Sequence, residues 1–60
     1  MYVWQMNNGR WHISMLTGRS LSGTLSSRCE AHRLMHRGYD TETEARAAER
    51  HILTLIEVAA

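Results

Sequence analysis

Ser27-Arg28-Cys29-Glu30-Ala31 and Thr41-Glu42-Thr43-Glu44-Ala45 carry the same helix-start signal twice, within the stretch from 23 to 49. Each has a hydroxyl residue, a glutamate three positions later, and then an alanine. In such a capping box the hydroxyl accepts the N–H of the third helical residue, and the glutamate reaches back to the N-cap N–H. The pattern predicts two helices, at about 28–37 and 42–58, with Gly38 ending the first as a left-handed residue.

The residues before Ser27 predict strands and turns, so the expected fold class is α+β: a three-stranded antiparallel meander followed by two helices. Asn8-Gly9 is a strong signal for a two-residue hairpin turn in which both residues take positive φ. That turn pairs Trp4 with Ile13. A three-residue loop would instead pair Trp4 with His12 and mix polar with apolar residues, so we expect the two-residue turn. The apolar face then consists of Tyr2, Trp4, Met6, Trp11, Ile13 and Met15.

The third strand is expected over Ser20 to Leu25, which alternates polar and apolar residues, after a turn at Thr17-Gly18-Arg19. Pairing Met15 with Leu21 completes one dry and one wet sheet face. The apolar side gains Leu21, Gly23 and Leu25, and the polar side holds Gln5, Arg10, His12, Ser14, Ser20, Ser22 and Thr24. One alternative stays open, in which residues 30–37 form a further strand instead of a helix. The whole chain, 1–60, is expected to be one small domain.

The two predicted helices differ in their apolar faces. The first has a narrow stripe of Ala31, Leu34 and Met35, and its other side carries Arg28, His32, Arg33, His36 and Arg37. The second has a wider stripe of Ala45, Ala48, Ile52, Leu55, Ile56 and Ala59. Its C-terminal half either completes the core of the single chain or forms a homodimer seam. The residues expected in such a dimer interface are Ile52, Leu53, Leu55 and Ile56.

The length of the chain, 60 residues, limits its core. A domain this short buries only about 60% of its unfolded surface. Cys29 is the only cysteine, so no disulfide can form within one chain, and we expect dimerisation to add stability. No apolar run is long enough for a membrane span, and the first residues lack the basic start of a signal peptide. We therefore expect a cytoplasmic protein that makes no membrane contact.

Charge is unevenly distributed, although the net charge is only +1. Residues 1–39 hold five arginines against one glutamate, and residues 40–60 hold two arginines against five acidic residues. All seven basic residues are arginine. A GC-rich coding sequence produces the same bias, but arginine also suits bidentate contact with phosphate or carboxylate. Such asymmetry indicates one face that meets an anionic partner.

No constellation indicates catalysis or a metal. Cys29, His32 and His36 lie on one side of the first predicted helix, but a structural zinc site needs four ligands. The fourth would have to be His12 or His51, and nothing in the sequence places either nearby. Cys29 and His32 form a nucleophile pair without a third residue to orient the histidine. We expect no metal, no cofactor and no enzyme activity.

A resemblance is carried by Gly9-Arg10-Trp11-His12-Ile13, Gly18-Arg19, Ser22-Gly23-Thr24-Leu25-Ser26-Ser27 and Glu30-Ala31. Over about residues 2–37, this sequence pattern resembles that of the DNA-binding domains of plant ethylene-response factors and the arm-binding domains of phage-type integrases. The resemblance implies three strands followed by a helix, with the exposed sheet face in the major groove of DNA. It places Arg10, His12 and Ser14 on that face, with Gln5 beside them. The chain departs from the family at Ser22, where leucine is usual, and its first strand has no basic residue.

The expected function is a small nucleic-acid-binding accessory or regulatory protein of a phage or other mobile element. Arg28, Arg33 and Arg37 are expected to contact phosphates, with His32 and His36 assisting in weakly acidic solution. Arg10, His12 and Arg19 extend this patch along the sheet. The alternative is a small phage-type inhibitor or adaptor that docks on a host protein complex, either on an acidic surface through its arginines or through Glu42, Glu49 and Glu57. A third possibility is a structural dimerisation module that binds nothing else.

Overall fold

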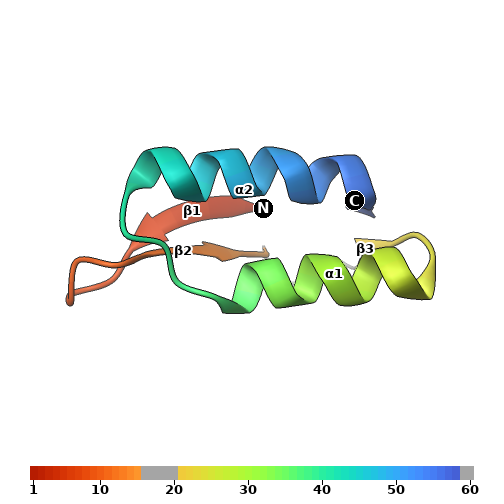
Figure 1. Cartoon of the computed structure of the whole chain (residues 1–60), viewed down its shortest axis with the longest axis horizontal. Coiled ribbons are helices and arrows are strands. Elements are labelled where there is room, and N and C mark those ends of the chain that lie inside the picture. Colours follow the sequence, from red (N-terminus) through yellow and green to blue (C-terminus); the bar gives the residue numbers. More distant parts are fainter. Residues whose placement is uncertain (16–20, 59–60) are drawn as a thin grey trace.

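The computed structural model describes residues 1–15 and 21–58 and has the predicted α+β class. Two helices run in opposite directions, and the hairpin formed by the first two strands lies along both (Figure 1). The elements are β1 (Tyr2–Gln5), β2 (Trp11–Ser14), β3 (Leu21–Ser22), α1 (Leu25–His36), α2 (Glu42–Leu55) and β4 (Glu57–Val58). The predicted turn at Thr17-Gly18-Arg19 and the predicted burial of Ala59 lie outside the described residues.

The core lies between the β1–β2 hairpin and the two helices. Its buried side chains are Ile13, Ala31, Tyr39, Ala45, Ile52 and Ile56. Leu34 and Met35 pack against it from α1, and Ala48 and Leu55 pack against it from α2. The helical spacing of these residues places them on one side of each helix, so the described members of both predicted apolar stripes are confirmed.

The β1–β2 hairpin has a three-residue loop, so the two-residue turn predicted at Asn8-Gly9 is wrong. Trp4 pairs with His12 and Val3 pairs with Ile13. The N–H of Gly9 donates to the carbonyl of Met6 at 2.9 Å, and Gly9 has positive φ, 89°, while Asn8 does not. A type I′ turn requires positive φ at two successive residues, whereas a tight turn followed by one left-handed glycine gives a three-residue loop with a bulge.

This shift of one residue turns every side chain of β1 to the opposite face. Val3 packs against the core, while Tyr2 and Trp4 are exposed. The predicted placement of Tyr2, Trp4 and Met6 on the apolar face is therefore wrong. β2 has the predicted orientation, with Trp11 and Ile13 directed to the core.

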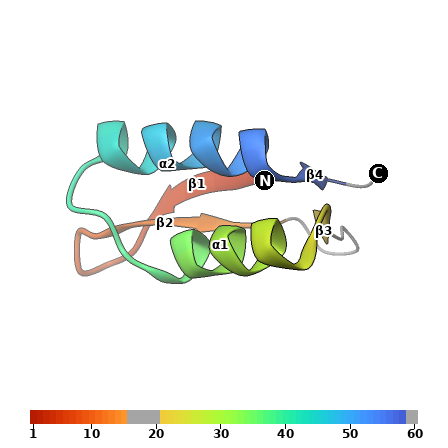
Figure 2. The same ribbon diagram turned by 45° about the vertical axis from the view of Figure 1, so that its right-hand side comes forward.

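β3 pairs with β4 and not with β2, so the predicted pairing of Met15 with Leu21 is wrong. Leu21 pairs with Val58, and Ser22 pairs with Glu57, in antiparallel register. The described residues thus form two two-stranded sheets, and the three-stranded meander is not present among them. Figure 2 shows β3 and β4 at the same end of the molecule, near the start of α1. The partner of β3 comes from residues 57–58, which were predicted to end the second helix.

α1 begins at Leu25, three residues before the predicted start, because Thr24 and not Ser27 is its N-cap. The Thr24 hydroxyl accepts the N–H of Ser27 at 3.1 Å and donates to the Ser27 hydroxyl at 3.0 Å. Thr24 and Ser27 are both candidate caps, and capping at Thr24 makes the helix about one turn longer than capping at Ser27 would. α2 begins at the predicted place, since the Thr41 hydroxyl accepts the N–H of Glu44 at 3.2 Å, and it ends at Leu55. Residues 30–37 do not form a strand.

Gly38 does not end α1 as a left-handed residue, which corrects a further prediction. The helix ends with Arg37 in extended conformation, and Gly38 does not have positive φ. A Cβ atom at Gly38 would lie 2.7 Å from Nε of Arg10. This glycine therefore allows the Arg10 side chain to approach the chain between the helices.

Candidate nucleic-acid interface

The predicted basic residues of α1 share an exposed surface, called here the α1 basic face. It consists of Arg28, His32, Arg33, His36 and Arg37, all of which are exposed. Burial of Ala31 on the other side of the helix fixes the direction in which this face points. The rings of His32 and His36, one turn apart, are stacked with centroids 6.2 Å apart. All five side chains are exposed, as their helical spacing predicts, and their role in binding nucleic acid stays a prediction.

The charges of the α1 basic face are only partly compensated. Arg33 Nη2 lies 2.6 Å from both carboxylate oxygens of Glu30, the only acidic residue of α1. Arg28 has no ion pair with any residue that the structure describes. The Arg37 guanidinium lies over the ring of Tyr39, 4.9 Å from its centroid, and it pairs with no carboxylate among the described residues. The face therefore keeps a positive charge.

Tyr39 fixes the end of α1 against the hairpin. Its backbone exchanges two hydrogen bonds of 2.9 Å with Trp11, and its hydroxyl donates to the carbonyl of Leu34 at 2.7 Å. Burial raises the pKa of Tyr39 above its ordinary value of 10.0, and the nearby Arg37 charge partly opposes this rise. The phenol is thus held in its neutral, hydrogen-bonding form beneath the Arg37 guanidinium.

The residues predicted to extend this patch along the sheet are placed differently. Arg10 Nη1 lies 2.6 Å from Oδ1 of Asp40, so a carboxylate compensates its charge. His12 lies on the outer side of β2, and its Nε2 atom is buried without a hydrogen-bond partner among the described residues. Arg19 lies outside the described residues. The structure therefore groups the five residues on or next to α1 and does not add Arg10 to them as a free cation.

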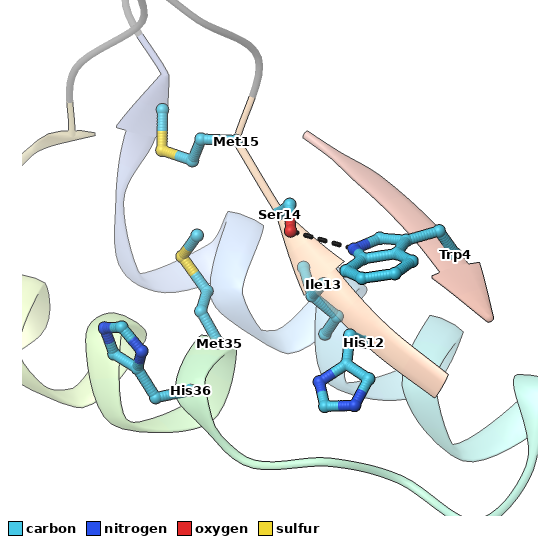
Figure 3. Close-up of a pocket in the computed structure, with 7 residues that line it drawn as sticks. All are labelled: Trp4, His12, Ile13, Ser14, Met15, Met35 and His36. Carbon is cyan, nitrogen blue, oxygen red and sulfur yellow. Dashed lines mark hydrogen bonds between the residues drawn. The ribbon is translucent and has the colours of Figure 1, made fainter. Parts of the chain in front are cut away.

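Sequence reasoning missed the outer face of the hairpin, where Tyr2 and Trp4 are 44% and 38% exposed. Beside Trp4 lies a cavity of about 430 Å³. Figure 3 shows Trp4, His12 and Ser14 on the hairpin side of this cavity, and Met35 and His36 on the α1 side. No residue of the loop signals this outward placement of Trp4, because Asn8-Gly9 fits both a two-residue and a three-residue loop.

Comparison with known proteins gives no relative. No protein-family model, no curated protein and no solved structure matches this chain.

Grouped metal ligands and membrane-spanning helices are both absent from residues 1–15 and 21–58. Within these ranges no three His, Cys, Asp or Glu side chains are grouped so that they hold a metal ion, and Cys29 is exposed. No helix in the described part of the chain is both long enough and apolar enough to cross a membrane.

The four residues predicted for a dimer interface are not equally accessible. Ile52 and Ile56 are buried in the core of the single chain, 0% and 5% exposed, so they offer no surface to a partner. Leu55 is half-buried against the same core. Leu53 is 50% exposed and lies on the outer side of α2. A dimer that uses this helix would therefore have to form around Leu53.

Proposed function

We propose that this protein binds nucleic acid through the α1 basic face. The observation that carries the proposal is the grouping of three arginines and two histidines on one exposed surface, with a single acidic residue beside them. Arginine forms strong, bidentate hydrogen bonds with phosphate oxygens, and these bonds are strengthened by charge. Phosphate contacts supply most of the affinity of non-specific nucleic-acid binding.

The size of the α1 basic face limits the affinity for nucleic acid that we expect. α1 has 12 residues, so it is about 18 Å long and can follow only a few phosphates. Binding that rests on a few phosphate contacts has a Kd of about 10⁻⁴–10⁻⁶ M at physiological salt. Arg10 adds little, since Asp40 already compensates its charge. Weak, salt-sensitive binding suits an accessory or regulatory factor of a phage or other mobile element, and we include that role in the proposal.

The test is fluorescence anisotropy of a labelled random duplex, titrated with protein at about 50 and 200 mM salt. We expect micromolar binding at the lower salt that weakens steeply at the higher salt. Arg28→Ala with Arg33→Ala should lower the slope of log K against log salt by about 2. Absence of binding at the lower salt would overturn the proposal and favour the alternative, a protein partner with an acidic surface.

A matched control comes from α2. Arg46 pairs with Glu42 at 3.2 Å, as Arg33 pairs with Glu30, and Arg50 is exposed like Arg28. Arg46→Ala with Arg50→Ala therefore changes the net charge by the same amount and also releases one carboxylate. We expect this control to keep nearly the wild-type affinity. Equal losses in the two double variants would mean that net charge, and not the α1 basic face, determines binding.

A second proposal concerns self-association through Leu53. This exposed leucine borders a cavity of about 400 Å³ whose other side is formed by Ser22 and Gly23. An exposed apolar residue beside a hollow suits a protein contact, and dimerisation would add stability to a short chain. Sedimentation equilibrium should show a dimer that Leu53→Glu converts to a monomer. A wild-type protein that stays monomeric at high micromolar concentration would contradict this.

A further inference from the structure

The outer face of the hairpin carries aromatic side chains that the core does not use. Cross-strand partners share a face, so Tyr2 and Trp4 of β1 lie on the same side as Ser14 and His12 of β2. Tyr2 and Trp4 are two of the large apolar side chains that stay exposed in the described part of the chain. Exposed aromatic rings on a sheet serve as platforms on which nucleobases stack.

Trp4 is held in a defined orientation. Its indole Nε1 donates to the hydroxyl of Ser14 at 2.9 Å, and its ring lies 5.6 Å from that of His12, tilted by 35°. Figure 3 shows the indole reaching from β1 toward Ser14 of β2. Because the indole N–H is already bonded, the side chain presents mainly its π surface to a ligand. Because Trp4 is already held in place, stacking of a ligand on it costs little side-chain conformational entropy.

The cavity beside Trp4 suits a flat group with polar edges. Its volume, about 430 Å³, lies in the range of about 300–1,000 Å³ that is usual for small-ligand pockets. The walls are apolar at Met35 and polar at His12 and Ser14. At this wall, His12 Nε2 has no hydrogen-bond partner among the described residues, and the edge of a nucleobase carries groups that can serve as one.

His36 connects this cavity with the α1 basic face. It lines the cavity on the α1 side and also stacks on His32, and both histidines belong to the α1 basic face. A chain whose base occupies the cavity would thus have its phosphates beside the cations of α1. The complementary charge identifies the occupant, because a nucleotide strand supplies both the flat base and the adjacent phosphates.

We infer that the ligand of this protein is a single-stranded nucleic acid, with a base stacked on Trp4 and phosphates on the α1 basic face. This inference rests on the proposed function and names its substrate class. A base in a duplex is stacked and paired, and moving it into a pocket costs free energy that a single strand does not pay. The single strand should therefore bind more tightly than the duplex of equal length.

The experiment compares labelled single strands, oligo(dT) and oligo(U), with a duplex of the same length at about 50 mM salt. Trp4→Leu should weaken single-strand binding by about 5- to 150-fold, the usual range for loss of one stacking ring. It should leave duplex binding unchanged, since the arginines of α1 remain. Trp4→Phe, which keeps an aromatic ring, should restore most of the single-strand affinity.

The outcomes separate this inference from the proposed function. Equal affinity for single strand and duplex, with no effect of Trp4→Leu, would overturn the inference and leave phosphate binding by α1 standing. No binding to any of the three probes would overturn both. If Trp4→Leu weakened single-strand and duplex binding equally, with a wild-type circular dichroism spectrum, stacking would be excluded as its role. Preference for oligo(dT) or for oligo(U) assigns the strand to DNA or RNA.

Discussion

The helices α1 and α2 begin in the same way but make different contributions to the molecule. Each is capped by a threonine whose hydroxyl accepts the N–H three residues on, at 3.1 Å in α1 and 3.2 Å in α2. Ala31 is the only buried residue of α1, whereas α2 buries both Ala45 and Ile52. The cap determines where a helix starts, and the buried face determines what it supports. α2 supports the core, and α1 is left with a broad exposed side.

The largest effect should follow from truncating the buried face of α2. Ile52 is the largest fully buried side chain, and Ile52→Ala should lower the free energy of unfolding by about 2–5 kcal/mol. A chain of this length has a total stability of roughly 3–9 kcal/mol, so this variant should be close to unfolding. Urea denaturation followed by circular dichroism measures the change.

The adjacent residue provides the control. Leu53 is half exposed, and Leu53→Ala should change the free energy of unfolding by less than about 0.5 kcal/mol at protein concentrations where the chain is monomeric. Similar losses at positions 52 and 53 would mean that α2 does not face the core as described.

A smaller effect should come from the caps, and it should be alike in both helices. Thr24→Ala and Thr41→Ala each remove a hydroxyl that accepts a backbone N–H, and each should cost about 1 kcal/mol. Thermal melts of the two variants test this. Ser27→Ala is the informative comparison, because Ser27 would be the cap if α1 began at 28. A larger loss from Ser27→Ala than from Thr24→Ala would contradict the observed start.

The connection between the helices should make stability sensitive to alkaline pH. Burial raises the pKa of Tyr39, so the folded protein keeps this proton at pH values at which the unfolded chain releases it. The contribution is complete below about pH 10 and is lost as the pH rises above that value. Tyr39→Phe should flatten this alkaline decline in urea-denaturation midpoints, whereas Tyr2→Phe, at an exposed site, should keep it. Parallel curves for the wild type and Tyr39→Phe would show that Tyr39 is not the group responsible.

A small change in stability should follow from removing charge from α1. The pair between Arg33 and Glu30 is exposed, and such pairs contribute only about 0.3–0.5 kcal/mol. Arg28→Ala with Arg33→Ala should therefore alter the free energy of unfolding by less than about 1 kcal/mol while it weakens nucleic-acid binding. A strongly destabilised double variant would mean that the α1 basic face has a structural role.

Much of the helical part of the fold could be predicted from the sequence. Apolar spacing identified Ala31 on α1 and Ala45 and Ile52 on α2, and Thr41 was recognised as a cap. The start of α1 was missed because Thr24 and Ser27 both have the chemistry of a cap. Local sequence does not decide which of the two becomes the N-cap. The choice depends on whether the extra turn of helix, which begins at the earlier cap, is stable in the folded protein.

The sheets were harder to predict because strand pairing depends on contacts between distant residues. Asn8-Gly9 is compatible with two loop lengths, and the choice between them turns β1 over without changing its sequence. Trp4 was therefore expected in the core, although it lies beside the candidate site. The pairing of β3 with residues 57–58 joins parts of the chain more than thirty positions apart, and no local pattern indicates it.

The exposure of the α1 basic face was predictable because its members lie within ten positions of one another, on α1 or directly after it. Exposure on a helix follows from spacing, and spacing is visible in the sequence. The compensation of Arg10 by Asp40 was not predictable, since it depends on the approach of β2 to the chain between the helices.

The most direct test of the difference between the helices is a titration of ¹⁵N-labelled protein with a short oligonucleotide, followed by backbone amide chemical shifts. We predict that residues 25–37 shift in a salt-dependent manner, together with β2 around His12, while the outer side of α2 around Leu53 stays unchanged. Shifts that centre on α2 and leave residues 25–37 unmoved would contradict the assignment of α1 as the surface that meets nucleic acid.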